Sequence, residues 1–550
     1  MSFALLAMLL VAADPQPVDA VVVAPREYLP ALQPLIGHRQ AQGHRFGYIP
    51  NTKSAEEIRA DIRTAAKGGA LKYVLLVGDA EPAARTDAAV RARSVPVHLH
   101  QAVVNVKWGS EPQIATDNWY ADLDDDQQPD LAIGRLPADS PAELSRLVEK
   151  ILAYERSVDF GPWRQRVNLI AGVGGFSPLV DSILETATSK LLTSGIPAAY
   201  ETRMTYGSWS SPYCPDPRLF HATTVERHNE GCLFWVYLGH GHYTELDRVS
   251  IPGERFHIFD VDDCDELKAT SGPPIAIMLA CYTAAFDQPR DCLAEELLRA
   301  EGGPIAVFGG SRVTMPYAMA VMGTSLMEEY FENRPPTLGD AILAAKRRTM
   351  KLVDEKNPLQ DANRLLLDGI ASIISPSREL LEEERREHLQ LFNLLGDPML
   401  RLAHPGQIAL SAPKEAAPGE TLQISGSSEL VGRGVLELVC RRDQFKTAPP
   451  VRERFDPTDK GLAALHEVYE RSNDRCWARW ALDLPGGEFA TQVTIPSECR
   501  GACHFRLVAD DGKSHALGAA NIYVRPQSPR VTAAANVGQA IHVAPLPAAK

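Results

Sequence analysis

The chain has 550 residues, of which 45% are hydrophobic and 23% are charged, and its formal net charge is −14. This length is too great for one hydrophobic core, so we expect two to four domains of ordinary globular composition. The acidic balance, without a run of Lys or Arg to offset it, argues against a nucleic-acid-binding surface.

The first residues have the pattern of a secretory signal peptide. Residues 3–13 form an unbroken apolar run, followed by Asp14 and Pro15. The run is too short to span a bilayer but has the length of a signal-peptide core, although no Lys or Arg precedes it. We expect a signal peptide over residues 1–17 and a secreted or extracytoplasmic protein; the alternative is a wrongly assigned start or a frayed terminus. No other segment of the sequence has the pattern of an integral membrane span.

Residues 18–158 alternate between apolar strands and amphipathic helices. Ser54 with Glu57, and Ser140 with Glu143, form capping boxes where two of the helices begin. Apolar strands that alternate with helices form a parallel sheet covered on both faces, so this region is predicted to be an N-terminal α/β subdomain. The clearest strands are predicted at 20–25, 72–80 and 130–137, and the helices at 54–68 and 140–155.

The alternation restarts over residues 159–404, which we predict to be a second α/β subdomain. Two successive blocks of this kind indicate two sheets side by side, of which the second carries the functional site. Strands are predicted at 166–172, 233–239, 274–280 and 304–310, and helices around 180–194, 292–301, 317–332, 337–352 and 376–391.

The C-terminal part has a different texture. From about residue 405 the sequence shows short alternating strands separated by Pro and Gly, which predict an immunoglobulin-like β-sandwich without helices over residues 405–526. Residues 527–550 are rich in Ala and Pro and are predicted to be a flexible tail.

The nine cysteines are an odd number, so at least one has no disulfide partner within the chain. Cys499 and Cys503 are close in sequence, and Cys440 and Cys476 lie in the same region, which would suit disulfides in an exported module. Cys281 ends an apolar strand and is the candidate for a free thiol.

Two strand ends carry side chains suited to catalysis. His240 follows the predicted strand 233–239, and Cys281 follows the predicted strand 274–280. If these strands are neighbours in a parallel sheet, the imidazole and the thiol share one crevice, which is the arrangement for nucleophilic acyl transfer. The backbone N–H groups of Gly241 and Cys281 are candidates for an oxyanion hole. Taken singly, a cysteine after a strand is more often inert packing, and a Gly-His turn is more often only a turn.

Several separated motifs lie between residues 20 and 404. They are LLVGDAEP at 75–82, TDNWYADLDDDQQPDLAIGRLP at 116–137, YLGHG at 237–241, MLACYTAAFDQPRDCLAEELLRAEGGPIAVFGGS at 278–311 and FNLLGDPMLRL at 392–402. Together they resemble the gingipain family of cysteine peptidases. The combination of Gly-His-Gly, then Ala-Cys, then a Cys-x-Ala-Glu helix is specific to that resemblance.

The resemblance implies a caspase-like fold, protein or peptide substrates and a His/Cys dyad without a required cofactor. His240 would protonate the leaving amine, and Cys281 would be the nucleophile. The resemblance also implies an acidic residue that supports the histidine, but Val173 stands near its expected position. Asp181 lies where a residue accepting a basic P1 side chain would be; the alternative is an N-cap or first-turn Asp of the helix that follows. Ser311 would edge the same pocket, next to Arg312.

Metal binding is a weaker interpretation of two motifs. His240 and His242 could clamp a metal, but no further ligand is evident from their spacing, so we assign no metal ligands there. The acidic loop 122–130 has oxygen ligands at alternating positions, as calcium loops do, yet it lacks the usual Gly and the closing Glu. A structural calcium ion is therefore possible, and a solvated acidic turn is the alternative.

The sequence predicts a secreted cysteine endopeptidase: a gingipain-like catalytic unit followed by an immunoglobulin-like module. The first alternative is an inactive relative that binds or adheres, and the second is a thiol transpeptidase on the same scaffold. Gingipains are made with an N-terminal pro-region, whereas here the first strand follows the predicted signal almost at once. We therefore expect any latency to come from the C-terminal module or an internal loop.

Overall fold

The structure, a computed structural model, describes residues 17–172, 195–269, 271–351, 362–375 and 378–526. The predicted signal peptide up to residue 16, the predicted helix around 180–194 and the predicted tail lie outside these residues, as do Val173 and Asp181. Among the helices of the described part, none is long and apolar enough to cross a membrane.

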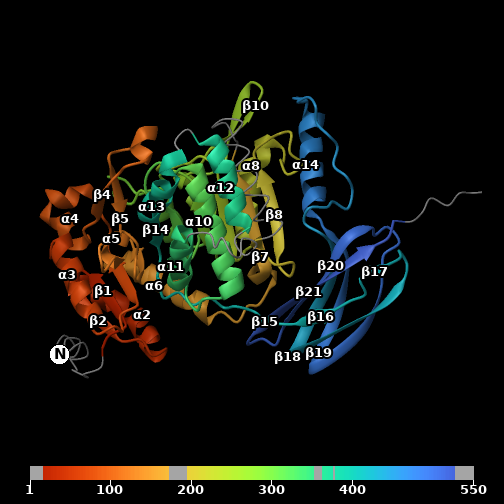
Figure 1. Cartoon of the computed structure of the whole chain (residues 1–550), viewed down its shortest axis with the longest axis horizontal. Helices are drawn as coiled ribbons and strands as arrows, with labels where there is room; N and C mark the ends of the chain where they lie inside the picture. Colours follow the sequence, from red (N-terminus) through yellow and green to blue (C-terminus); the bar gives the residue numbers. More distant parts are fainter. Residues whose placement is uncertain (1–16, 173–194, 270, 352–361, 376–377, 527–550) are drawn as a thin grey trace, which may run out of the picture.

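One ten-stranded sheet forms the centre of the N-terminal 400 residues (Figure 1). Its strand order is β2-β1-β3-β6-β14-β13-β12-β9-β7-β8. Strands β1, β3, β6, β7, β9, β12, β13 and β14 are buried along their whole length, as expected for strands covered on both faces. The strand bounds are β1 Ala20–Ala24, β2 Phe46–Pro50, β3 Tyr73–Val77, β6 Ala132–Leu136, β7 Arg166–Ala171, β8 Glu201–Tyr206, β9 Phe234–Leu238, β12 Ile275–Leu279, β13 Ala306–Gly310 and β14 Phe392–Leu395.

The single sheet corrects the prediction of two sheets side by side. The short strand β14 joins the halves because it pairs in parallel with β6 and antiparallel with β13. The strands of the two halves therefore run in opposite directions, and one hydrophobic core extends through both halves. Each half repeats one order, in which its second strand lies at the outer edge and its third lies on the other side of its first.

Helices cover both faces of the sheet (Figure 1). In the first half, side chains of α3 and α5 pack with Val21, Val74 and Ile133 on one face, whereas α2 and α6 pack with Val22 and Leu75 on the other. The capping box of Ser54 and Glu57 is present at the start of α3. The helix bounds are α2 Leu29–Ala41, α3 Ala55–Ala66, α4 Ala88–Arg93, α5 Asn118–Ala121, α6 Pro141–Arg156, α8 Phe220–Asn229, α9 Leu293–Arg299, α10 Pro316–Glu328, α11 Leu338–Met350, α12 Ala362–Ile374 and α13 Leu381–Leu391.

Two short hairpins leave the main sheet. The first pairs β4, His98–Gln101, with β5, Gln113–Thr116. The second pairs β10, Arg248–Ile251, with β11, Glu254–His257, and lies between β9 and β12 in the chain. Both hairpins interrupt the α/β alternation at positions that flank the candidate site.

The C-terminal module is a β-rich sandwich, but it also contains a helix that the sequence analysis missed. Helix α14, Asp459–Asn473, lies between its two longest strands. Its buried side chains Leu462, Leu465, Val468 and Tyr469 have helical spacing. The strand bounds are β15 Gly406–Gln407, β16 Ala409–Ser411, β17 Glu415–Ala416, β18 Thr421–Cys440, β19 Cys476–Thr494, β20 Gly501–Asp510 and β21 His515–Val524.

All nine cysteines lie in the described part of the chain, and all are free thiols there. The disulfides suggested by the sequence are therefore not formed in this structure. Cys440 pairs in register with Cys503, not with Cys476, because Cys476 lies opposite Val439. The Cys499 and Cys503 sulfur atoms are 3.9 Å apart, a contact between two thiols and not a bond.

The C-terminal module contacts the edge of the sheet through α14. The Tyr469 hydroxyl makes a 3.0 Å hydrogen bond with that of Thr205 on β8, and Glu470 pairs with Arg227 of α8 at 2.8 Å. Figure 1 shows α14 beside β8 and α8.

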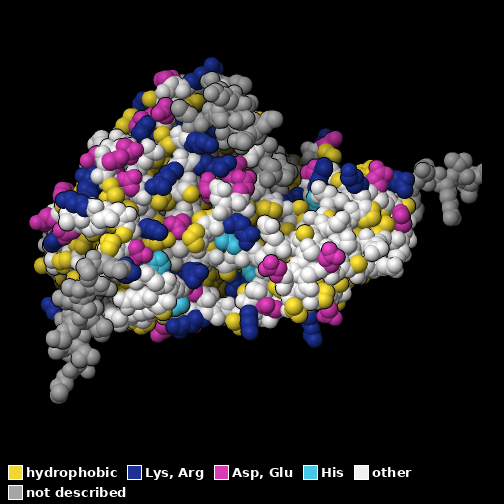
Figure 2. All heavy atoms as spheres, turned by 60° about the horizontal axis from the view of Figure 1, so that its bottom comes forward, with side chains coloured by type: hydrophobic (Ala, Val, Ile, Leu, Met, Phe, Trp, Pro, Cys, Tyr) yellow, Lys and Arg dark blue, Asp and Glu magenta, His cyan; other side chains and the backbone are white. Residues whose placement is uncertain are grey.

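The face shown in Figure 2 has acidic and basic side chains interspersed, so it has no large patch of a single charge sign.

Candidate active site

The register of the sheet brings His240 and Cys281 to the same place. Strands β9 and β12 are parallel neighbours, and Leu238 lies directly opposite Leu279. His240 stands two residues after Leu238, and Cys281 stands two residues after Leu279. Neighbouring strands lie about 4.8 Å apart, so both residues leave the sheet at adjacent positions on its edge. The neighbouring strands on which the sequence hypothesis depended are confirmed.

Gly241 packs directly against the turn that contains Cys281. A Cβ atom added at Gly241 would lie 2.7 Å from the carbonyl oxygen of Cys281 and 2.9 Å from the Cβ of Ala280. Such distances are too short for any side chain, so only glycine allows the two turns to approach this closely. The backbone of the histidine turn is therefore in contact with the backbone of Cys281.

The Cys281 sulfur faces the segment that follows β13. The N–H of Thr314 donates a 3.3 Å hydrogen bond to Sγ, and the Thr314 hydroxyl lies 3.5 Å from the same atom. The side chain of Cys281 is partly exposed. Tyr282 follows with φ of +58°, a left-handed conformation that is unusual for a bulky residue. Residues held in such sparsely populated backbone conformations are concentrated at functional sites, and here one lies beside a cysteine whose sulfur accepts a hydrogen bond.

The buried hydroxyl of Tyr237 is hydrogen-bonded to the backbone of the turn that contains His240. It donates a 2.7 Å hydrogen bond to the carbonyl oxygen of His240 and accepts a 3.3 Å bond from the N–H of Asp247. Burial, together with the charges of Asp247 and Cys281, raises the pKa of Tyr237 well above its ordinary value. Tyr237 therefore remains a neutral donor over the working pH range and links the histidine turn to Asp247.

His240 also lines an open cavity of about 420 Å³. The cavity lies on the β10–β11 side of the histidine, and both acidic and basic side chains reach it. Cys281 is not among its lining residues, since its sulfur faces Thr314. The lining is formed by His240, Gly241, His242, Glu245, Leu246, Asp247, Arg248, Ser250 and Arg255.

Glu111 connects the loop between β4 and β5 to the residues that follow His240 and Cys281. Its two carboxylate oxygens accept hydrogen bonds of 2.9 Å from the hydroxyls of Tyr243 and Tyr282. Burial alone would raise the pKa of Glu111, but a backbone N–H, these two hydroxyls and Arg312 together lower it. The carboxylate is therefore charged and tethers the residues that follow His240 and Cys281. Sequence reasoning missed Glu111 because it lies in a loop without a motif.

The structure places the other predicted site residues as follows. Ser311 is fully buried, and its hydroxyl donates a 2.7 Å hydrogen bond to the carbonyl of Ala115, so this side chain is engaged in packing the core. Arg312 forms a two-pronged ion pair with Asp287, at 2.8 and 2.6 Å. The exposed ring of His242 packs edge-on against Tyr243, with the ring centroids 4.6 Å apart.

The acidic loop 122–130 gathers three carboxylates. One oxygen each from Asp122, Asp124 and Asp130 lies within 4.8 Å of the other two. Arg59 already pairs with Asp122 at 3.3 Å and with Asp125 at 2.8 Å, which offsets part of the negative charge. The donor set is the oxygen type that calcium prefers, and a structural calcium ion here stays a prediction.

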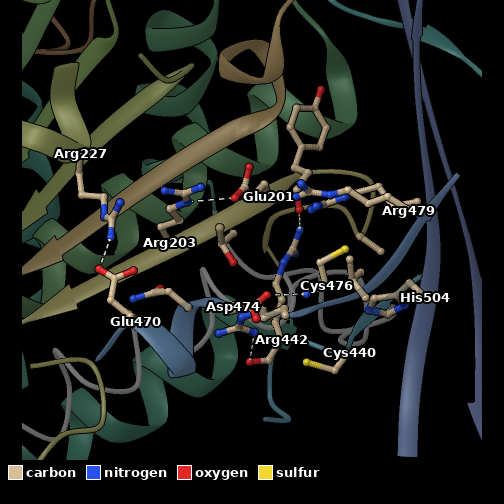
Figure 3. Close-up of a pocket in the computed structure, with 17 residues that line it drawn as sticks. Glu201, Arg203, Arg227, Cys440, Arg442, Glu470, Asp474, Cys476, Arg479 and His504 are labelled. Atoms are coloured by element: carbon tan, nitrogen blue, oxygen red, sulfur yellow. Dashed lines mark hydrogen bonds and ion pairs between the residues drawn. The ribbon is translucent and has the colours of Figure 1, made fainter. Parts of the chain in front are cut away.

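A second cavity, of about 170 Å³, lies between the sheet edge and the C-terminal module (Figure 3). Glu201 on β8 is one of the residues that line it and is partly buried. Burial alone would raise the pKa of Glu201, but Arg166, Arg203 and Arg506 lower it to about 2. Since Arg506 belongs to β20, the charge of Glu201 helps to hold the module against the sheet. Arg442 reaches across the same junction and donates to the carbonyl of Tyr200 at 2.6 Å.

Comparisons with known proteins agree with this architecture. The model of Peptidase family C25 matches residues 13–403. Gingipain R2 of Porphyromonas gingivalis is 21% identical over 426 residues, which are 74% of this chain and 49% of that protein. Lys-gingipain of the same species is 24% identical over 313 residues, which are 54% of this chain and 16% of that protein. The chain thus spans about half the length of the first relative and less of the second.

The fold is that of a solved gingipain. The crystal structure of the Arg-specific cysteine proteinase gingipain R has a TM-score of 0.51 and 15% sequence identity, and the match covers 93% of this chain and all of that one. At this identity the likeness shows the fold alone. With the family model matching well over half of the sequence and the histidine and cysteine meeting at one sheet edge, the chain belongs to Peptidase family C25, the family of the gingipains.

Proposed function

We propose that this chain is a cysteine endopeptidase that hydrolyses peptide bonds through His240 and Cys281. The observation that carries the proposal is the register of β9 and β12, which sets the two residues at equivalent positions past neighbouring strands. An imidazole and a thiol at such positions form the nucleophile and acid–base pair of thiol-dependent acyl transfer. Membership of the cysteine peptidase family supports the same chemistry and implies protein or peptide substrates.

The reaction follows from the positions of these groups. The Cys281 thiolate attacks the scissile carbonyl carbon and forms a C–S bond, while the carbonyl electrons move to the oxygen. The N–H groups of Gly241 and Cys281 are the proposed donors to that oxyanion, each worth roughly 3–4 kcal/mol in the transition state. As the C–N bond breaks, His240 donates its proton to the leaving amine. Water, deprotonated by His240, then cleaves the thioester and releases the Cys281 thiolate.

Thr314 has a positioning part in this scheme. Its backbone N–H donates to the sulfur at 3.3 Å, and a hydrogen bond to a thiolate favours the charged nucleophilic form. The bond also fixes the direction of the sulfur relative to the strand end. Because the donor is a backbone group, its direction depends on the path of the chain after β13.

A basic P1 preference is the finer part of the proposal. It rests on Asp181, which lies outside the described residues, and on the resemblance to a peptidase whose crystal structure is described as Arg-specific. The neighbouring cation Arg312 is neutralised by its pair with Asp287, so it presents less repulsion to a basic side chain than the sequence suggested. Ser311 is buried, so any part it has in this pocket would come from its backbone.

The decisive experiment maps cleavage of a mixed peptide library by mass spectrometry. The wild-type chain and the Cys281→Ala variant are incubated in parallel, and products are scored only where the variant yields none. We expect Cys281-dependent cuts, concentrated after Arg or Lys. Equal product patterns from both proteins would remove the peptidase proposal. Cuts after other residues would remove the role of Asp181 and leave the peptidase proposal intact.

The same assay distinguishes peptide hydrolysis from two alternative functions. The absence of an acidic residue near Val173 favours an inactive relative that binds proteins, which would capture library peptides without cutting them. A transpeptidase would form the same thioester but pass the acyl group to an amine. Adding an acceptor peptide in excess separates the two reactions, because a hydrolase gives free carboxyl ends and a transpeptidase gives ligated products.

We also propose that the protein is exported. The apolar run at residues 3–13 supports export, since it has the length of a signal-peptide core. N-terminal sequencing of the protein recovered outside the cell should begin near residue 18. Recovery only inside the cell, with residue 1 retained, would contradict the proposal.

A further inference from the structure

Two histidines and a carboxylate, none of which is assigned to catalysis, meet at the base of the β10–β11 hairpin. His221 lies in the first turn of α8, His257 ends β11, and Asp263 lies in the short 3₁₀ helix Val261–Glu266. One potential ligand atom from each of the three side chains lies within 4.8 Å of the other two. The cluster therefore joins three segments that are separate in the sequence.

The spacing within the cluster is close to that of a tetrahedral metal site. The Asp263 carboxylate oxygen Oδ2 lies 2.5 Å from His257 Nε2 and 3.6 Å from His221 Nδ1. Ligand atoms about 2.0–2.2 Å from a zinc ion in tetrahedral geometry are about 3.4 Å from each other. Glu266 Oε2 and His221 Nε2 are separated by about this length, 3.6 Å. The His257 contact is shorter, so these two atoms would move apart around a cation.

Further polar groups surround the three side chains. Asp260 Oδ2 lies 3.6 Å from His257 Nε2, and Glu266 Oε2 lies 3.6 Å from His221 Nε2. His221 Nδ1 donates to the carbonyl oxygen of Ile258 at 3.1 Å, so a metal would bind His221 through Nε2, the nitrogen beside Glu266. Backbone carbonyls and carboxylates of this kind commonly fix the orientation of ligating histidines.

The composition of the cluster favours a transition-metal dication. The carboxylates of Asp260, Asp263 and Glu266 lie around the two imidazoles. Among the described residues, no arginine or lysine pairs with these three carboxylates, so a divalent cation would offset their negative charge. Imidazole nitrogens with one carboxylate suit zinc, whereas calcium and magnesium prefer oxygen ligands alone. The side chains of His221 and His257 are 25% and 30% exposed, which leaves the site open to solvent and to ions.

We propose that His221, His257 and Asp263 bind Zn²⁺ in a structural site, with Glu266, Asp260 or water as the fourth ligand. The site ties α8 to the segment that follows His240. That segment folds back on itself, because Leu246 donates to the carbonyl of Phe259 and Val261 to that of Thr244. A metal at residues 257–263 therefore fixes the base of the hairpin whose first strand borders the His240 cavity.

Zinc binding can be measured without relying on peptidase activity. The full chain is prepared with Cys281→Ala, so that the active-site thiol does not compete for the metal, and is titrated with Zn²⁺ by calorimetry after chelator treatment. We expect one equivalent to bind. Adding His257→Ala or Asp263→Asn should lower the affinity by more than about 100-fold, the upper range for loss of an outer-shell partner. Co²⁺ should give the visible absorption of a tetrahedral site in the parent and not in these variants.

His44→Ala is the matched control, since His44 also pairs with a carboxylate, Asp19, at 2.9 Å. His44 lies in no group of three possible ligands among the described residues, so this variant should bind as the parent does. Amide hydrogen exchange over residues 244–263 gives a second readout. Zn²⁺ should slow this exchange in the parent and leave it unchanged in Asp263→Asn, whose shape is nearly conserved.

Three results would overturn the proposal: no zinc binding by the parent, equal affinity in Asp263→Asn, or unchanged exchange in residues 244–263 when zinc binds. Equal affinity would place the ion at thiols such as Cys499 and Cys503. None of these results bears on the peptidase proposal, because the titrated protein lacks the nucleophile. Likewise, a failed cleavage assay would leave the zinc measurement valid.

Discussion

The most direct test of the site's architecture is the substitution Gly241→Ala. The new Cβ would lie 2.7 Å from the Cys281 carbonyl oxygen, 2.9 Å from the Ala280 Cβ and 2.9 Å from the Thr283 Cγ2. With about 3.5 Å as a favourable separation, each contact must lengthen by roughly 0.6–0.8 Å. None of these atoms is the end of a long flexible side chain, so the two strand ends themselves must move apart.

The expected effects on stability and on catalysis differ in size. Overpacking of this kind typically destabilises a fold by about 1–3 kcal/mol. Displacing reacting groups by about 1 Å can lower the rate roughly 100-fold, so we expect kcat/KM to fall between about 10-fold and 100-fold. The alanine keeps the backbone N–H, so the loss reports the approach of the two turns and not a missing oxyanion donor.

Three measurements check this prediction. Denaturant unfolding gives the stability, peptide hydrolysis gives kcat/KM, and peptide mapping after brief alkylation gives the reactivity of Cys281. Gly37→Ala in α2 is the control, because a Cβ there meets nothing within 4 Å and should stabilise the helix by up to about 1 kcal/mol. Wild-type stability and activity in Gly241→Ala would refute the close packing inferred for the two turns.

Three further predictions concern groups around the sheet. Tyr237→Phe leaves the His240 carbonyl and the Asp247 N–H without their buried partner and should destabilise the fold by about 1–3 kcal/mol. It should also lower kcat, whereas the control Tyr48→Phe, which loses a hydrogen bond to the Ala24 carbonyl, should lower the stability without lowering kcat. Because the pKa of Glu201 is lowered to about 2 in the fold, its charge stabilises the fold fully above pH about 4.5 and less as the pH falls toward 2. The free energy of unfolding of the wild type should therefore fall by up to about 3 kcal/mol more over this range than that of Glu201→Gln. Parallel plots of unfolding free energy against pH for the two proteins would contradict this prediction. Calcium should raise the melting temperature of the wild type but not of Asp124→Asn, and equal shifts in both would exclude the acidic loop as the site.

The sequence was sufficient to place His240 and Cys281 at one edge of the sheet because both residues follow uninterrupted apolar strands. Strands β9 and β12 are buried throughout, and their ends coincide with a change from apolar residues to Gly-His and to Cys. Their parallel pairing follows from the α/β alternation, which makes the strand ends meet at one edge. The prediction therefore required only local patterns and one general rule of sheet topology.

The same reasoning failed where a contact depends on distant pairing. Strand β14 has only four residues, and it joins the halves through a single register pair with β6, Leu395 with Arg135. Nothing in its own sequence distinguishes a strand that closes one sheet from a strand that ends a second one. Helix α14 is a different kind of miss, because the spacing of its apolar residues was visible and was outweighed by the surrounding β pattern.

Glu111 and the His221 cluster were hidden from the sequence for a common reason. Glu111 contacts Tyr282, 171 residues later in the sequence, and His221 in α8 contacts Asp263 in the 3₁₀ helix after the β10–β11 hairpin. A ligand or tether assembled from separate loops has no spacing signature, unlike motifs carried by one helix or one turn. Such groups become visible only when the fold has brought the loops together.

The segment between β9 and β12 carries both proposals, and this placement has a mechanical consequence. One end of the segment is His240, whose turn rests on the Tyr237 hydroxyl and on the backbone of Cys281. Farther along it are Asp247, in the His240 cavity, and then two of the three proposed zinc ligands, His257 and Asp263. The glycine contact acts directly on the turns of His240 and Cys281, whereas a metal would act only through the hairpin. The position of His240 should therefore depend strongly on Gly241 and weakly on the metal, so zinc would shape the cavity wall more than the reacting atoms.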